Sequence, residues 1–169
     1  MKKVICIVLT LILCITAVTC FAESDPTERF GKNEEPTYYI CRPNVKCRSL
    51  ENPEDFVTLH FGEEVKILEQ RGEYTDIEYG DGQKGYVTTG FIAEVYYPML
   101  YIAKDAQQYL SPFPTMNETD FGYGAGGLRW DERAIVIYAI EDYFYIVTEE
   151  GFCGYIPNDS PYISIYTGE

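Results

Sequence analysis

The chain repeats itself, and this repeat constrains the possible folds more than any other feature. Residues 59–87 align without a gap with residues 128–156 at an offset of 69. So many coincidences in one register indicate a duplicated structural unit. The matched pairs include Leu59 with Leu128, Val65 with Ala134, Ile67 with Val136, Tyr74 with Tyr143, Ile77 with Ile146, Gly82 with Gly151, Gly85 with Gly154, Tyr86 with Tyr155, and Val87 with Ile156.

The offset changes on both sides of this block. Upstream, Tyr39-Ile40 matches Tyr101-Ile102 at an offset of 62, so the second copy has gained seven residues, which we place in the loop 111–128. Downstream, "GYVTTGFI" matches "GYIPNDSPYI", which is two residues longer. Loops tolerate insertions and paired strands do not, so the pattern predicts equal strands joined by unequal loops.

The composition predicts that these strands form an all-β fold. The chain has 16 tyrosines and many valines and isoleucines, and Asp81-Gly82 is a typical hairpin turn. Five or six short strands in about 60 residues bury little surface as an open sheet, so closure into a small barrel is favoured. We therefore predict two tandem barrels, residues 37–97 and 98–169, in close contact because almost no linker separates them.

The N-terminus predicts export. A basic start precedes an uncharged apolar run that ends in small residues, as in a signal peptide over residues 1–22. A retained membrane anchor and a lipoprotein modified at Cys20 are the alternatives. Residues 23–36 are polar and are predicted to be a flexible leader, and the mature protein is predicted to be secreted or extracytoplasmic in the cell envelope, without a membrane span.

The strong negative charge restricts the partners. The formal net charge is −14, and loss of Lys2 and Lys3 with the signal peptide takes it to about −16. A protein so acidic repels nucleic acids and anionic surfaces. We therefore expect cationic or neutral partners and no nucleic acid.

Three cysteines remain after removal of the signal peptide. Cys41 and Cys47 enclose a Pro-Asn turn, so a local disulfide between them is the favoured pairing. Three is an odd number, which leaves Cys153 as a free thiol or as a link to a partner. The alternative is that all three are small buried side chains.

No catalytic or metal site can be assembled from the sequence. A thiol nucleophile needs a nearby base, and the single histidine, His60, falls in a strand-like segment where we expect it to face solvent. Clusters with metal-ligand spacing and phosphate-binding loops are also missing from the sequence. We predict that the protein is not an enzyme and uses no metal and no cofactor.

The order of motifs resembles the bacterial SH3 (SH3b) family. "VKCRS", "LHFGEEVKIL" and "YTDIEYGDGQKGYV" match its successive strands, and the first copy fits over nearly its whole length. The second copy fits from Leu128 onward. The resemblance implies SH3-like barrels of five or six strands and a binding role, since family members contact peptidoglycan or peptides as targeting modules.

A peptide groove in the second copy is the site that the resemblance implies. Pro157 and Tyr162 match the closing segment of peptide-binding SH3 domains, and Tyr143 stands where such grooves have tryptophan. Tyr109 and Tyr155 complete the predicted aromatic groove, which suits an extended peptide of limited conformational freedom. Acidic residues close by in the sequence favour a cationic peptide.

The sequence thus predicts a non-catalytic, exported module that binds a peptide or a peptidoglycan stem peptide. The alternative is an interaction or inhibitor-like protein that docks on a secreted partner through the loop 111–128. Proline at the start and glycine at the end of that loop suit a segment that becomes ordered on binding.

Overall fold

The computed structural model describes residues 29–102 and 131–168, and the regular structure there is almost entirely β, as predicted. One short 3-10 helix, η2 (Thr89–Phe91), interrupts the strands. The strands are β1 (Thr37–Ile40), β2 (Val45–Ser49), β3 (Phe56–Leu59), β4 (Glu64–Arg71), β5 (Tyr74–Tyr79), β6 (Gln83–Thr88), β7 (Ile92–Val95), β8 (Leu100–Ile102), β9 (Arg133–Ile140), β10 (Tyr143–Thr148), β11 (Cys153–Pro157) and β12 (Ile163–Ile165).

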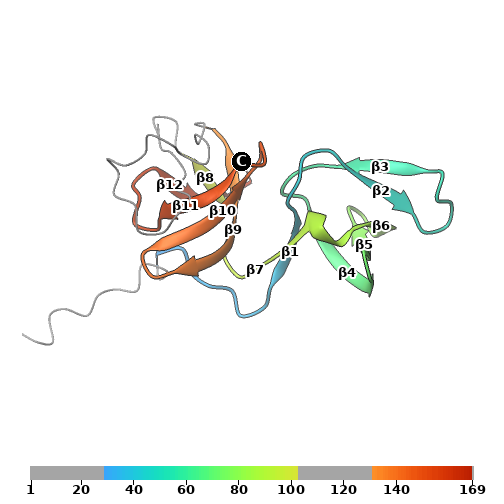
Figure 1. The fold of residues 1–169 in the computed structure, drawn as a ribbon, viewed down its shortest axis with the longest axis horizontal. Helices are drawn as coiled ribbons and strands as arrows, with labels where there is room; N and C mark the ends of the chain where they lie inside the picture. Colours follow the sequence, from blue (N-terminus) through green and yellow to red (C-terminus); the bar gives the residue numbers. More distant parts are fainter. Residues whose placement is uncertain (1–28, 103–130, 169) are drawn as a thin grey trace, which may run out of the picture.

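The strands form two antiparallel sheets that lie side by side (Figure 1). The first sheet has the order β3-β2-β6-β5-β4-β1-β7, and the second has the order β11-β10-β9-β8-β12. Strands β1 and β7 pair with each other and lie on the side of the first sheet that is nearer the second (Figure 1).

Among the residues that the structure describes, the predicted closure into barrels is not found, because the end strands of each order are not hydrogen-bonded to each other. The first sheet instead curls around one apolar cluster. Leu59 of β3 and Ile92 of β7, from its two ends, both contact this cluster, so side chains and not backbone hydrogen bonds close the structure. The buried members are Ile40, Val45, Cys47, Leu59, Val65, Ile77 and Val87.

The predicted register of the repeat is confirmed down to a backbone irregularity. In the β4–β5 pair Ile67 lies opposite Ile77 and Glu69 opposite Asp76, which leaves Leu68 as a bulge. The β9–β10 pair leaves Ile137 as the bulge, and the two positions differ by the offset of 69. A bulge bends its strand and increases the local twist, so the two copies curl at the same place.

The outer strands follow the other two offsets. Ile40 of β1 lies opposite Ile92 of β7, and Ile102 of β8 lies opposite Ile163 of β12. These partners are related by the offsets of 62 and 71 that the sequence alignment gives. The positions equivalent to β2 and β3 in the second copy fall between the two described ranges.

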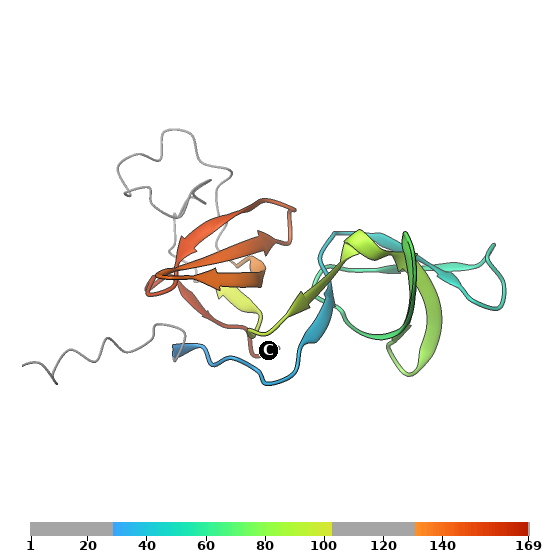
Figure 2. The same cartoon turned by 60° about the horizontal axis from the view of Figure 1, so that its bottom comes forward.

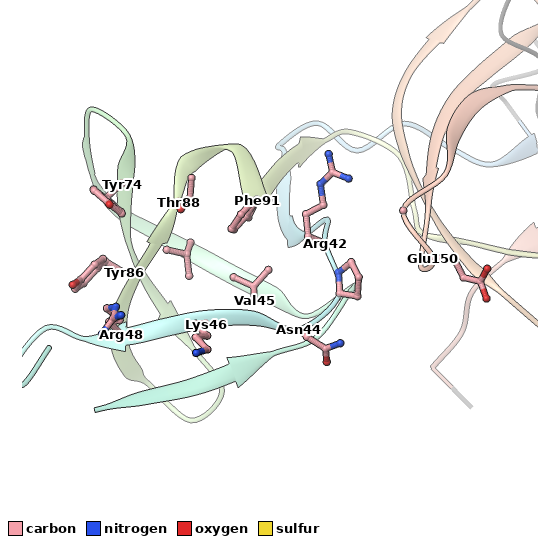
Figure 3. Close-up of a pocket in the computed structure, with 13 residues that line it drawn as sticks. Arg42, Asn44, Val45, Lys46, Arg48, Tyr74, Tyr86, Thr88, Phe91 and Glu150 are labelled. Carbon is pink, nitrogen blue, oxygen red and sulfur yellow. The ribbon is translucent and has the colours of Figure 1, made fainter. Parts of the chain in front are cut away.

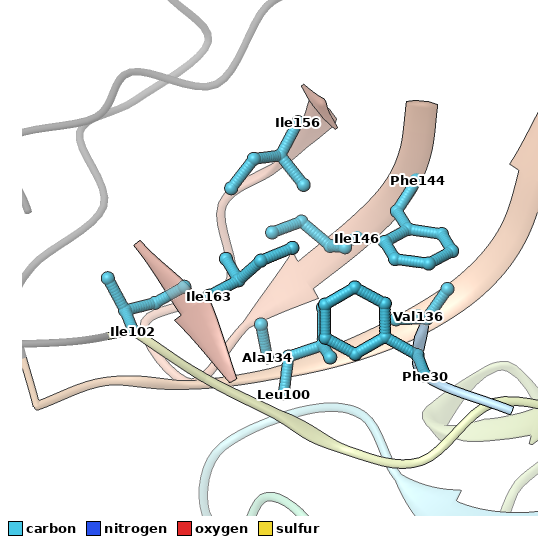
Figure 4. Packing of buried hydrophobic residues seen from close by; sticks show 9 residues of the cluster. All are labelled: Phe30, Leu100, Ile102, Ala134, Val136, Phe144, Ile146, Ile156 and Ile163. Carbon is cyan, nitrogen blue, oxygen red and sulfur yellow. The ribbon is translucent and has the colours of Figure 1, made fainter. Parts of the chain in front are cut away.

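The second sheet is completed by a residue from the segment expected to be a flexible leader. Phe30 is 5% exposed and its ring meets that of Phe144 edge-on, at 5.4 Å between centroids (Figure 4). Arg29 beside it donates to the backbone oxygens of Ser160 and Ile163 at 3.0 and 3.1 Å. From Arg29 onward the segment therefore runs along the second sheet before it enters β1 (Figure 2).

An apolar cluster separate from the cores of the two sheets joins the sheets to each other. Phe61, Val95 and Met99 from the first copy and the connection pack against Ile135 and Val147 of the second sheet. Arg133 at the start of β9 lies over the Phe61 ring, 6.0 Å from its centroid, and is held by Glu149 at 2.7 Å. The two sheets therefore meet at an apolar interface that the half-buried Arg133 borders.

The predicted Cys41–Cys47 disulfide does not form in this structure, where all three described cysteines are free thiols. Cys47 points from β2 into the core of the first sheet. Cys41 follows β1 and points to the interface between the sheets, where Cys153 also packs. Side chains alternate along extended backbone, and Ile40 points into the core of the first sheet, so the next residue, Cys41, points to the other side. The two thiols therefore lie in separate clusters.

Several predictions fall on residues outside the described ranges: the signal peptide 1–22, Tyr109 and the loop 111–128. Within residues 29–102 and 131–168, no helix combines the length and the apolar character needed to cross a bilayer.

Candidate functional site

The outer face of the second sheet carries its side chains in three cross-strand rows. Successive residues of a strand point to opposite faces. Since Phe144 and Ile146 of β10 point into the core, the residues that alternate with them face outward. The rows, each read from β9 through β10 to β11, are Ile140–Tyr143–Pro157, Tyr138–Tyr145–Tyr155 and Ile135–Val147–Cys153.

The middle row forms a packed set of aromatic rings, which we call the tyrosine face: Tyr138, Tyr145 and Tyr155. Tyr138 and Tyr145 stack with 5.0 Å between centroids, and Tyr155 tilts against Tyr145 at the same distance. The hydroxyls of Tyr138 and Tyr155 share a hydrogen bond of 2.8 Å. That bond, with smaller contributions from burial and the neighbouring phenols, raises the pKa of Tyr138 to about 12.

The structure brings together three of the five predicted groove residues. Tyr143 and Pro157 lie opposite each other in the row next to the tyrosine face, and Tyr155 belongs to the face itself. Tyr162 belongs to none of the three rows: it lies in the segment before β12, is 44% exposed, and donates its backbone N–H to the Ser160 hydroxyl. Tyr138 and Tyr145 were not predicted, although the alternation along β9 and β10 places them beside Tyr155.

Carboxylates border this surface at the β9–β10 turn. Glu141 and Asp142 form the turn next to Tyr143, and both are exposed. The buried Asn158 fixes the turn: its side-chain amide donates to the backbone carbonyl oxygen of Glu141 at 3.1 Å, and its backbone N–H donates to the backbone carbonyl oxygen of Asp142 at 2.9 Å. The aromatic rows therefore end at a fixed pair of negative charges.

The same face of the first sheet is a groove of about 750 Å³. Tyr74, Tyr86 and Thr88 line it, and they are the repeat counterparts of Tyr143, Tyr155 and Pro157. Figure 3 shows Tyr74 and Tyr86 at one end of the groove and Arg42 at the other. Its size is typical of a ligand site.

The groove exists because two neighbouring strands diverge. β2 pairs with β6 only through Arg48 and Ser49. At that point Gly85 permits the close approach, since a Cβ on it would lie 2.6 Å from the Arg48 carbonyl oxygen. Toward Val45 the strands separate, and the groove opens between them (Figure 3).

The groove was not predicted from the sequence. The signal was present, because the offset of 69 maps the predicted residues Tyr143 and Tyr155 onto Tyr74 and Tyr86. What obscured it was the net charge, which describes the whole chain and says nothing about where its few cations gather.

The arrangement of both faces suits binding. Over the described part of the chain, no three His, Cys, Asp or Glu side chains lie close enough to share a metal ion. His60 is exposed after β3, and its backbone N–H bonds to Glu63 at 3.0 Å. The chemistry offered by the two faces is ring stacking, hydrogen bonding and charge.

No protein-family model and no curated protein matches the sequence. Solved structures of NlpC2 and NlpC1 from Trichomonas vaginalis are similar to the chain, with TM-scores of 0.31 and 0.30 and 15% identity in both cases. The matches cover 80% and 79% of this chain and 50% and 47% of those chains. The chain thus spans about half the length of these solved structures, and a likeness of this size says nothing about a site.

Proposed function

We propose that the protein is a non-catalytic, exported binding module, built from two SH3-like copies, that holds an extended peptide across the tyrosine face. The tyrosine face carries the proposal. At the same positions the first copy has Glu69, Asp76 and Tyr86, so this site on the sheet accepts charged residues. Rings that remain on the outside of a sheet at such positions offer a partner apolar area and hydroxyls with little conformational entropy to lose.

An extended and cationic or neutral peptide fits this surface best. Aromatic rows bind extended chains through ring contacts and hydrogen bonds, and the limited freedom of proline-rich segments lowers the ordering cost. Glu141 and Asp142 at the end of the rows favour positive charge there. A peptidoglycan stem peptide is the envelope-derived form of the same ligand class.

The test is the loss of peptide binding when the tyrosine face loses one ring. The probe is the blocked peptide acetyl-(Lys-Pro-Pro)3-amide, and the measurement is isothermal titration calorimetry. Tyr138→Ala should weaken binding about tenfold, because a central aromatic contact contributes about 1.4 kcal/mol or more. Tyr162→Ala is the matched control, since Tyr162 is 44% exposed and Tyr138 is 42% exposed.

The control should bind the probe as the unmodified protein does. Equal affinities for the Tyr138 and Tyr162 variants would remove the tyrosine face as the peptide site. Sedimentation with purified peptidoglycan at low salt tests the envelope form of the ligand, and failure to sediment would restrict the proposal to free peptides.

A further inference from the structure

Four basic side chains gather around the groove of the first sheet in a strongly acidic protein. The formal net charge is −14, with only 13 lysines and arginines against 27 acidic residues. A smaller cavity of about 450 Å³ shares Tyr74 and Tyr86 with the groove, so the two openings adjoin at this ring pair. The basic residues that line the two cavities are Arg42, Lys46, Arg48 and Arg71.

Negative charge is scarce in the same linings. Glu150, from the β10–β11 turn of the second sheet, is the one acidic residue among those lining the two cavities. Arg71 is paired with Asp76 of β5, and the Arg48 guanidinium donates to the Pro53 oxygen at 2.8 Å. Arg42 is exposed at the end of the groove nearest the β10–β11 turn, and together with Lys46 and Arg48 it gives the groove a local positive field that the net charge conceals.

The groove also presents backbone that an extended chain can complement. Each of the two strands that border the groove is paired on the side away from it: β2 pairs with β3 through Val45–Cys47, and β6 pairs with β5 through Val87 and Thr88. In an antiparallel ladder the N–H and C=O groups point alternately to the two sides of a strand. Where β2 and β6 separate, the groups between them are therefore directed into the groove, as at a sheet edge that accepts an added strand.

We propose that this groove binds an acidic peptide segment in an extended conformation. Carboxylate side chains would lie near Arg42 and Lys46, and the peptide backbone would bond to the separated edges of β2 and β6. Tyr74 and Tyr86, whose rings meet edge-on at 5.6 Å, would contact the next residue of the ligand. A free polyanion could bind the cations, but it has no N–H donors for the carbonyl oxygens of the strand edges. A peptide can use both, so a peptide is the favoured ligand.

This inference goes beyond the proposed function, because it concerns the other copy and a ligand of opposite charge. The same face of the duplicated unit then serves two specificities. In the second copy it is aromatic and ends at Glu141 and Asp142, and in the first it is a basic groove.

The probe is the peptide (Glu-Thr)4-amide with fluorescein attached at its N-terminus, and the measurement is fluorescence anisotropy with the full chain. We expect binding that weakens with added salt. Binding of the cationic peptide (Lys-Thr)4-amide, labelled in the same way, should not change when Arg42 and Lys46 are replaced. Arg42→Gln with Lys46→Gln should weaken binding of the acidic peptide about five- to tenfold. Alternate N-methylation of the peptide should weaken it as well, because it removes the donors to the strand edges.

The matched control is Lys66→Gln with Lys84→Gln, which removes two exposed cations from the first sheet outside the groove. This pair changes the net charge equally and should leave the affinity within about twofold. An equal loss in both double variants would overturn the proposal in favour of a general charge effect. Polyphosphate that binds as tightly as the peptide, together with no effect of N-methylation, would overturn it in favour of an unspecific anion site.

The two proposals fail separately. Tyr138→Ala should leave binding of the acidic peptide unchanged and weaken only the Lys-Pro-Pro peptide. Loss of acidic-peptide binding in that variant would contradict the assignment of this ligand to the first sheet.

Discussion

Single residues explain why two copies of one unit present different surfaces. The pair Tyr138 and Tyr145 replaces Glu69 and Asp76 at the same cross-strand positions. In the first copy, Asp76 is only 8% exposed and is held by Arg71, whose counterpart in the second copy is Ile140. An ion pair and a ring stack are thus alternative ways to fill the same row, and only the rings offer an apolar contact to a partner.

The Tyr138–Tyr155 hydroxyl pair can be tested directly. Tyr155→Phe removes the partner hydroxyl, so the pKa of Tyr138 should fall from about 12 toward the ordinary value of 10.0. A phenol whose pKa is raised on folding contributes stability that is fully present below about pH 10 and is lost between about pH 10 and 12. The measurement is a pH titration of the ¹³Cζ tyrosine signals by NMR.

Tyr86→Phe is the control for this titration, because Tyr86 is the repeat counterpart of Tyr155 in the first sheet. It should leave the Tyr138 pKa at about 12. An unchanged Tyr138 pKa in the Tyr155 variant would show that burial or the neighbouring Tyr145, and not the hydrogen bond, raises it.

At the scale of elements, the repeat made most of the strand register predictable. Strands β4–β6 and β9–β11 carry a local signal, because each inward residue such as Ile77 has a counterpart such as Ile146 at the fixed offset. Closure could not be predicted in the same way. Whether an end strand such as β3 bonds across a gap depends on long-range geometry that a pattern of alternating residues does not contain.

Phe30 was hidden from sequence reasoning for a related reason. It stands alone among polar residues and before the first repeat, so no periodicity marks it. The candidate site was predictable to a similar extent: the resemblance to SH3 domains pointed to Tyr143, Tyr155 and Pro157, which the structure brings together. The divergence of β2 from β6, which creates the groove, depends on contacts far apart in the chain.

The segment containing Phe30 should contribute strongly to the stability of the second sheet. Phe30→Ala removes a ring that is 5% exposed and packs on Phe144, so it should lower the free energy of unfolding by about 3–5 kcal/mol. Phe56→Ala is the control, since Phe56 is 51% exposed and its loss should cost about 1 kcal/mol or less. Urea unfolding monitored by circular dichroism measures both, and similar values for the two variants would contradict a core role for Phe30.

At the scale of the whole molecule, the third outer row determines which faces of the two copies meet. The second sheet has Ile135, Val147 and Cys153 there, which pack on the first copy. The equivalent residues of the first sheet are Lys66, Glu78 and Lys84, a row of alternating charge. The apolar row therefore docks one copy onto the other, and the charged row discourages the first sheet from docking in the same way on another chain.

Ile135→Lys tests this view of the interface, because it introduces the residue that the first copy has at that position. Ile135 is 1% exposed and packs in the apolar cluster between the sheets. A lysine there must either separate the sheets or bury its charge in an apolar cluster. We expect a larger radius of gyration by small-angle X-ray scattering, and faster alkylation of Cys41, whose thiol the interface buries. Ile140→Lys, at a position that is 43% exposed on the same strand, should change neither quantity. If Cys41 stays as slow to react in the Ile135 variant as in the control, the apolar row does not hold the two sheets together.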